Sequence, residues 1–235
     1  MTRDHGQTWT NVAKNIKGLP ANPWIPQIEV SPHNDGEAFA VVNNYRQNDW
    51  HPYVYYTNDY GSKWTRIVSD SDVSGHCLSI VQDPVEPKLL FLGTENGLYV
   101  SFDKGINWNQ WEHDYPNIST MDMKIHPREN DLIVGTFARA AYILDDITPL
   151  RRVAASGTSG FENKIDIISV PDAYQAGSGR DPGVRFPGDM KWRGENRWSG
   201  ARIQYYCEMP EEKKEDDKEE EKKKSSSRYQ KPEWQ

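Results

Sequence analysis

A short pattern occurs three times in this chain, and its spacing limits the possible folds more than any other feature of the sequence. The pattern reads Ser/Thr-x-Asp-x-Gly-x-x-Trp and covers residues 2–9, 57–64 and 101–108. Successive copies of its aspartate lie 55 and 44 residues apart. Self-similarity at a period of this size is typical of repeat architectures.

A second element repeats in step with the first. It is a strand-like stretch that ends in a proline, at Pro32, Pro84 and Pro127, and these prolines are 52 and 43 residues apart. Because two unrelated signatures share one period, the repeat is a structural unit and not a coincidence of composition.

Each unit also contains two further strand patterns. The first is a short apolar run bounded by turn residues, as expected of a strand buried on both faces. The second is rich in aromatic and β-branched residues. The apolar runs are 38–42, 89–94 and 132–136, and their partners are 53–57, 98–101 and 141–144. With the proline-ended strand before them and the tryptophan-led strand after them, each unit has four strands, which predicts the blades of a β-propeller.

We therefore expect an all-β fold, a partial β-propeller of four-stranded antiparallel blades in residues 1–150. The expected order is one leading outer strand, two full blades at about 28–68 and 77–112, and a three-stranded blade at about 121–146. Since propellers close with roughly four to eight blades, we expect the chain to be a piece of a larger protein whose remaining blades are its partners.

Two segments follow the expected propeller. Residues 151–207 are expected to form an irregular crossover, and residues 208–235 a disordered charged tail. The tail contains fourteen consecutive charged residues at 211–224, eight acidic and six basic, a composition that cannot bury apolar area.

The repeated pattern has a mechanical interpretation as a hairpin turn between the third and fourth strands. Its glycine supplies a positive φ, its aspartate accepts hydrogen bonds from turn N–H groups, and its tryptophan begins the next strand and covers the hairpin. We expect these structural roles for nine residues: Asp4, Gly6, Trp9, Asp59, Gly61, Trp64, Asp103, Gly105 and Trp108.

At these residues the sequence resembles the Asp-box (BNR) repeat β-propellers, which are found in sialidases, xyloglucan-cleaving hydrolases and the sortilin/VPS10 receptors. The last blade, residues 126–150, looks like the closing repeat of bacterial sortilin-like "glycosyl hydrolase" propellers. This resemblance implies a secreted or periplasmic protein whose boxes lie on the edge away from the ligand. Those proteins usually carry Gly-Thr-His-Gly-Arg-Gly where this chain has residues 135–141, and Arg139 is retained there.

The same resemblance implies that a small β-sandwich follows the propeller, after a segment like residues 194–206. Residues 203–207 are expected to be its opening strand, but the charged run follows at once. The rest of the sandwich is therefore expected to be missing.

Composition and charge exclude several classes of protein. A net charge of −7 without a basic stripe argues against nucleic-acid binding, and no apolar run approaches the roughly 18 residues of a membrane span. Cys77 and Cys207 do not form a metal or redox motif. The start of the chain is polar, and no targeting signal is visible.

The residues that carry hydrolytic or metal chemistry are scarce. The pairs Asp145/Asp146 and Asp70/Asp72 are interpreted mainly as turn residues, so no catalytic residue is assigned. None of the six histidines has a metal-binding spacing, and each repeated turn offers one carboxylate where calcium needs several oxygens. We expect neither metal nor cofactor.

The most informative loop is 43–52, which is longer than its counterpart in the next blade. Its tyrosine, arginine, tryptophan and amide side chains are typical of a surface that contacts sugars or peptides, although a decorated hairpin is the alternative. The candidate ligand-binding residues are Tyr45, Arg46, Trp50, His51, Asp72, His76 and Arg139.

Two functional hypotheses remain from the sequence. The first is a binding module for a peptide or carbohydrate ligand, built on a sortilin-like propeller. The second is part of a secreted glycoside hydrolase, sialidase-like or xyloglucanase-like, whose catalytic residues lie mostly in the missing blades.

Overall fold

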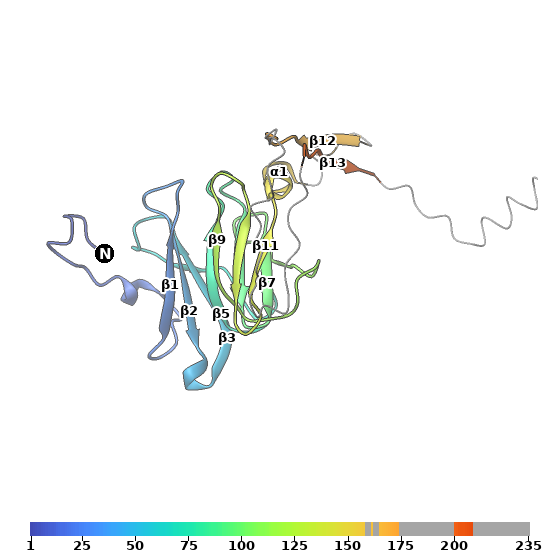
Figure 1. Ribbon diagram of the computed structural model, residues 1–235. Helices are drawn as coiled ribbons and strands as arrows, with labels where there is room; N and C mark the ends of the chain where they lie inside the picture. The colour runs from blue at the N-terminus through green and yellow to red at the C-terminus, as the bar shows by residue number, and fades with distance from the viewer. Residues whose placement is uncertain (158–160, 162–164, 174–199, 209–235) are drawn as a thin grey trace, which may run out of the picture.

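The computed structural model describes residues 1–157, 161, 165–173 and 200–208. The main body of this part of the chain contains three antiparallel sheets, which follow one another side by side (Figure 1). The first sheet contains β1 (Trp24–Val30), β2 (Ala38–Asn44), β3 (Asp49–Thr57) and β4 (Thr65–Arg66). The second contains β5 (Cys77–Gln82), β6 (Leu90–Thr94), β7 (Gly97–Ser101) and β8 (Asn109–Gln110). The third contains β9 (Thr120–Ile125), β10 (Leu132–Thr136) and β11 (Ala141–Leu144).

The predicted partial β-propeller is confirmed. In the two four-stranded sheets the strand order is the chain order, β1-β2-β3-β4 and β5-β6-β7-β8, as in a propeller blade. The first strands of neighbouring blades lie beside one another, because Gln27 on β1 bonds both the N–H and the C=O of Ile80 on β5, at 2.7 and 2.9 Å. The Ser79 hydroxyl on β5 in turn donates to the carbonyl of Thr120 on β9 at 3.4 Å.

Apolar side chains fill the spaces between blades. Phe39, Val54 and Leu92 belong to the cluster between the first and second blades, and Phe91 and Leu132 to the cluster between the second and third. Strands β2 and β6, which have a blade or packed residues on both sides, are almost wholly buried, as predicted.

The outer faces of the two end blades are partly open. On the third blade Ile133 and Ile143 are register partners, and they are 37% and 62% exposed. On the first blade Ile28 and Val30 are 61% and 64% exposed. Among the described residues no further blade covers either face.

The three repeated turns have the same hydrogen bonds. In the third copy the Ser101 hydroxyl donates to Asp103 at 2.8 Å, and Asp103 accepts the N–H of Asn107 at 2.8 Å. The N–H of Gly105 donates back to the Ser101 hydroxyl at 2.8 Å. The equivalent bonds in the other copies measure 2.8–3.1 Å. In every copy the glycine and the residue before it have positive φ, the backbone of a tight hairpin turn.

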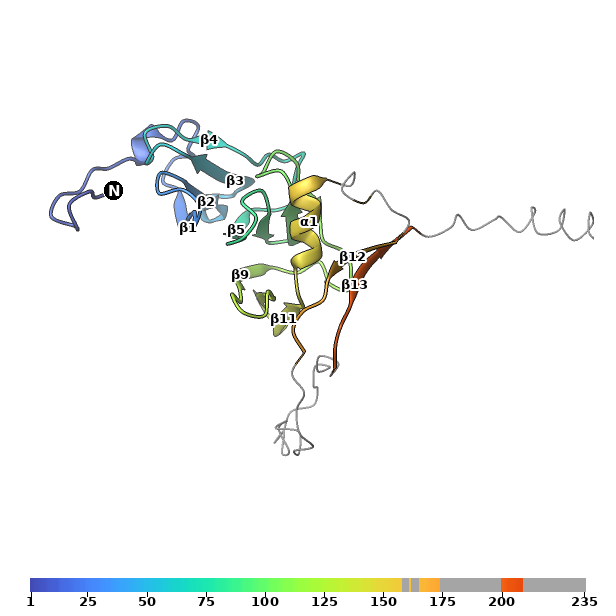
Figure 2. The same ribbon diagram turned by 90° about the horizontal axis from the view of Figure 1, so that it is seen from above.

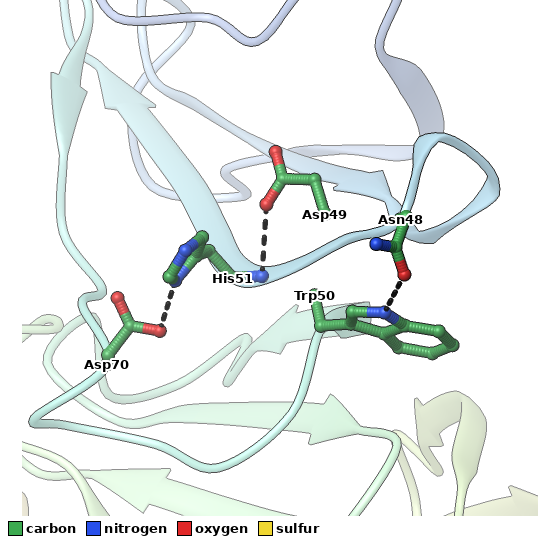
Figure 3. Close-up of a pocket in the computed structure, with 5 residues that line it drawn as sticks. All are labelled: Asn48, Asp49, Trp50, His51 and Asp70. Carbon is green, nitrogen blue, oxygen red and sulfur yellow. Dashed lines mark hydrogen bonds and ion pairs between the residues drawn. The ribbon is translucent and has the colours of Figure 1, made fainter.

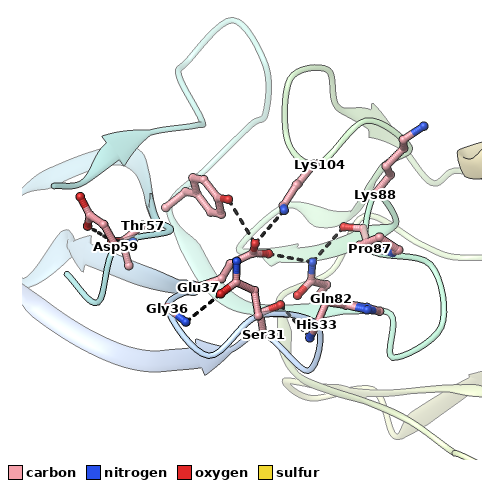
Figure 4. A network of polar contacts seen from close by, with 12 residues as sticks. Ser31, His33, Gly36, Glu37, Thr57, Asp59, Gln82, Pro87, Lys88 and Lys104 are labelled. Atoms are coloured by element: carbon pink, nitrogen blue, oxygen red, sulfur yellow. Dashed lines mark hydrogen bonds and ion pairs between the residues drawn. The ribbon is translucent and has the colours of Figure 1, made fainter. Parts of the chain in front are cut away.

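The edge of the blades that carries these turns, here called the turn edge, also holds a buried polar network (Figure 4). The Glu37 carboxylate on the first blade accepts bonds from Lys104 at 2.8 Å and Gln82 at 3.2 Å, both on the second blade. Tyr56 donates to it at 3.2 Å. Burial raises the pKa of Glu37, but the bonds from Lys104 and Gln82 outweigh burial and lower it below its ordinary value. The network joins the first two blades through an ionised carboxylate.

Helix α1 (Thr148–Ser156) follows the third blade and lies beside the second and third blades (Figure 2). Leu150 and Ala154 of the helix, and Ile147 just before it, pack into the core between those blades. Arg151 donates from Nη2 to the fully buried carboxylate of Asp83 at 2.8 Å and from Nη1 to the side chain of Asn130 at 2.7 Å. The helix thus ties the turn after β5 to the turn between β9 and β10.

Four details differ from the expectations or lie beyond them. No strand forms after the first turn; residues 13–15 form a short 3-10 helix, η1 (Ala13–Asn15), because no described strand offers a partner there. The apolar pattern gave no sign of helix α1. Strands β12 (Ile165–Ser169) and β13 (Gln204–Cys207) pair with each other, so the strand expected at 203–207 does form. The charged run at 211–224 lies outside the described residues.

Candidate functional site

The edge opposite the turn edge, here called the loop edge, carries the turns β2–β3, β6–β7 and β10–β11 and the connections between blades. The same backbone bond recurs along it. The N–H of Glu95, after β6, donates to the carbonyl of His76 at 3.1 Å, and the N–H of Phe137, after β10, donates to the carbonyl of Ser119 at 2.9 Å. Each connection is therefore held against a hairpin turn, and side chains from neighbouring blades meet at this edge.

The β2–β3 hairpin is longer in its strands and shorter in its loop than expected. The ten-residue loop predicted at 43–52 reduces to η2 (Tyr45–Gln47) and Asn48, whose φ is +60°. Asn44 and Asp49 are register partners, and the Asn44 amide donates to the Asp49 carboxylate at 3.3 Å. These polar side chains extend the pairing beyond the apolar part of the strands, which the sequence pattern could not show.

Three rings from two blades meet at this hairpin. Tyr45 stacks on His76 with ring centroids 4.8 Å apart and planes 29° apart. Trp50 lies 6.0 Å from the ring of Tyr45 and meets His76 edge-on at 5.7 Å. His76 is 3% exposed, whereas Trp50 is 55% exposed. The cluster therefore has a buried base and an open aromatic surface.

The surroundings of His76 favour the neutral form of its imidazole. Burial lowers its pKa below the ordinary value, and Glu95, with Oε2 3.8 Å from His76 Nε2, opposes this only in part. The Nδ1 atom of His76 has no hydrogen-bond partner among the described residues. A neutral imidazole is suited to stacking between the rings.

Arg46 lies over two aromatic rings at the outer end of the cluster. Its guanidinium carbon is 4.7 Å from the ring of Tyr45 and 5.3 Å from the ring of Trp24 on β1. Trp24 is 57% exposed and was absent from the candidates. Trp24 lies opposite Asn43, beside the β2–β3 hairpin. It would have been identified only if the register between β1 and β2 had been known.

His51 points away from Trp50 and pairs with Asp70 in the connection to the second blade (Figure 3). Its Nδ1 lies 2.6 Å from the carboxylate of Asp70, and this hydrogen bond raises the pKa of His51. An open pocket of about 530 Å³ lies here. Its lining residues are Asn48, Asp49, Trp50, His51 and Asp70.

The other two candidates are not part of this cluster. Asp72 accepts hydrogen bonds from the N–H and hydroxyl of Ser69 at 2.8 and 2.6 Å, so it shapes its own connection. Arg139 lies exposed on the β10–β11 turn of the third blade, where the Thr136 hydroxyl bonds its carbonyl.

The described residues offer little for metal or nucleophilic chemistry. They contain no group of three or more His, Cys, Asp or Glu side chains placed to hold a metal ion. Asp146 accepts the N–H and hydroxyl of Thr148 at the start of α1, as a turn residue does. Burial raises the pKa of the Cys77 thiol to about 12, which makes it inert. In the part of the chain that the structure describes, no helix is both long and apolar enough to cross a membrane.

The chain matches no protein-family model and no curated protein. It is similar to the solved structure of the GH74 xyloglucanase from Xanthomonas campestris, with 13% identity and a TM-score of 0.41 over 62% of this chain and 25% of that one. It is also similar to YCF48 bound to D1 peptide, with 17% identity and a TM-score of 0.39 over 63% of this chain and 48% of that one. The chain thus spans a quarter of the first structure and about half of the second.

Proposed function

We propose that the loop edge between the first and second blades binds a peptide or carbohydrate ligand, and that the chain is a ligand-binding part of an extracytoplasmic β-propeller. The cluster of Tyr45, His76 and Trp50 is the observation that carries this proposal. It sets an exposed aromatic surface on a buried base, and both blades hold it in place.

The surroundings of Trp50 suit such a ligand. Large aromatic side chains bury much apolar area on binding and dominate the energetics of interfaces. The pocket beside Trp50 is lined by polar side chains, those of Asn48, Asp49, His51 and Asp70. A few polar groups beside an apolar surface fix the orientation of a bound molecule.

The proposal separates this edge from the turn edge. There the nine residues of the repeated turns have a structural role, which the hydrogen bonds shared by the aspartates and glycines of the three hairpins support. The exposed isoleucines of the end blades, Ile28 on β1 and Ile133 with Ile143 on the third blade, are surfaces for further blades of a complete propeller.

A glycoside hydrolase is the competing function, and it needs an acid and a second carboxylate on either side of the sugar. On the loop edge Asp49 already accepts bonds from Asn44, Tyr53 and the N–H of His51, and Asp70 pairs with His51. These contacts favour binding over catalysis at this edge.

The test is to screen the chain against immobilised glycans and peptides, together with two tryptophan variants. Trp50→Ala removes the exposed ring of the cluster, and Trp9→Ala removes a tryptophan that is 73% exposed on the first repeated turn. We expect Trp50→Ala to lose retention of the ligand and Trp9→Ala to keep it. The melting temperature of Trp50→Ala should be unchanged. Equal retention by both variants would contradict the proposal, and release of sugar product from a bound glycan would favour the hydrolase.

A further inference from the structure

Arg46 is held in an unusual way for an exposed arginine. Its guanidinium lies over Tyr45 and Trp24, at 4.7 and 5.3 Å from the two ring centres. Tyr45 is itself stacked on His76. The ring that orients the guanidinium is therefore anchored to the second blade, so Arg46 is more restricted than a free surface side chain.

The charge of Arg46 is not neutralised within the described part of the chain. None of its N–H groups donates a hydrogen bond there, and no carboxylate lies within ion-pair distance of it. The neighbouring carboxylates have other partners: Asp49 bonds Asn44, and Asp70 bonds His51. Arg66, the other arginine near this hairpin, donates to the carbonyls of Val68 and Pro52.

A guanidinium stacked on rings keeps its donors available. Cation–π attraction acts between a ring and the flat face of a guanidinium, whereas the N–H groups lie in the guanidinium plane. These donors form a fork that matches the two oxygens of a carboxylate, and such bidentate pairs are among the stronger hydrogen bonds of proteins. The rings also lower the entropy that is lost when the fork binds.

We propose that Arg46 is the anchor for a carboxylate group of the ligand, with Trp24 and Tyr45 as the residues that position it. This proposal rests on the proposed function, and it narrows the ligand to one with a free carboxylate beside a part that contacts Trp50. The terminal carboxylate of a peptide and the carboxylate of an acidic sugar share this chemistry.

Two pairs of probes distinguish these sources and test the anchor. The first pair is N-acetyl-phenylalanine and its amide, and the second is digalacturonate and its methyl ester. Dissociation constants are measured for the whole chain by isothermal titration. We expect a carboxylate probe to bind about tenfold or more tightly than its neutral partner, as a charge-assisted bidentate contact implies. A preference in the first pair alone assigns a peptide terminus, and one in the second pair alone assigns an acidic sugar.

Four variants connect that preference to the stacked guanidinium. Arg46→Gln should abolish the preference, and Arg46→Lys should lose most of it because an ammonium lacks the planar fork. Trp24→Ala should weaken the preference several-fold while leaving the charge in place. The control is Arg3→Gln, because Arg3 also lies over a ring, that of Tyr60 at 5.3 Å, but on the turn edge; it should change nothing.

Equal binding of both members in both pairs, or an unchanged preference in Arg46→Gln, would overturn the carboxylate anchor. That failure differs from failure of the proposed function. If Trp50→Ala still weakens the neutral probes, the loop edge binds ligands without a carboxylate contact; if Trp50→Ala affects no ligand, the binding edge itself is wrong.

Discussion

The ring of Tyr45, on the first blade, stacks on the imidazole of His76, which precedes the second blade, with centroids 4.8 Å apart. This contact crosses the boundary between two repeats that are also joined by apolar packing, by the bonds from Gln27 to Ile80 and by the Glu37 network on the other edge. The shape of the loop edge therefore depends on how two neighbouring blades meet. His76 also faces a carboxylate, since its Nε2 lies 3.8 Å from Oε2 of Glu95.

Lowering the pH should weaken the fold through His76. Burial lowers its pKa in the folded state, so as the pH falls below its ordinary value of 6.5 the unfolded chain takes up the proton first. The free energy of unfolding should therefore begin to decrease as the pH falls through 6.5, and it should go on decreasing until the pH passes the lowered pKa of the folded state. His76→Phe keeps a stacked ring without a titrating group and should show a shallower decrease in denaturant titrations. An identical pH dependence in both proteins would contradict this assignment.

Glu37→Gln should destabilise the boundary between the first two blades. The change leaves Lys104 beside a neutral amide and should lower the free energy of unfolding by about 1–3 kcal/mol. Because the folded-state pKa of Glu37 is lowered from its ordinary 4.5, its contribution is present above pH 4.5 and is lost as the pH falls through the lowered pKa. The variant should therefore lose less stability than the parent in that acidic range.

A double-mutant cycle with Lys104→Met checks whether the two side chains act as a pair. The losses in Glu37→Gln and Lys104→Met should sum to more than the loss in the double variant, because both single changes remove the same contact. Additive losses would show that the 2.8 Å contact between them contributes nothing by itself.

Asp103→Ala should affect stability without affecting binding. Asp103 accepts the N–H groups of Ile106 and Asn107 within its turn, and their loss should cost about 1 kcal/mol. Thermal melting and ligand retention are measured together, with Asp35→Ala as the matched control, because Asp35 is an exposed aspartate outside the repeated turns. Lost retention with unchanged melting in Asp103→Ala would place part of the ligand site on the turn edge.

Arg151→Met should show how much helix α1 contributes. The variant leaves the fully buried carboxylate of Asp83 without its guanidinium, which costs about 3 kcal/mol when a buried pair is broken. The control Arg128→Met removes an arginine that is 77% exposed and pairs with its neighbour Glu129, and it should change stability by about 0.5 kcal/mol or less. Equal effects would mean that α1 is not tied to the blades.

The blades could be predicted because their sequence features repeat along the chain. Features that depend on contacts between blades could not be predicted. Strands such as β6 and β11 are found where their apolar and aromatic runs predict them, because a blade repeats one local pattern. Helix α1 was missed, since Arg151 and its distant partner Asp83 hold it in place.

The same distinction applies to the candidate site. The composition of the β2–β3 hairpin indicated Tyr45, Arg46 and Trp50, and the structure brings them together. Trp24 could not be found that way, because only the pairing of β1 with β2 carries it to Arg46. Asp72 looked equivalent in sequence, yet its carboxylate is engaged by Ser69.

The most direct test of the proposed binding edge is to map where a retained ligand lies. Amide and side-chain resonances of the chain would be followed by nuclear magnetic resonance during titration with a glycan or peptide from the screen. We expect the largest shifts at Tyr45, Trp50 and His76, with little change at Asp59 and Asp103. Shifts concentrated on the repeated turns, or on the open faces at Ile28 and Ile143, would contradict the account.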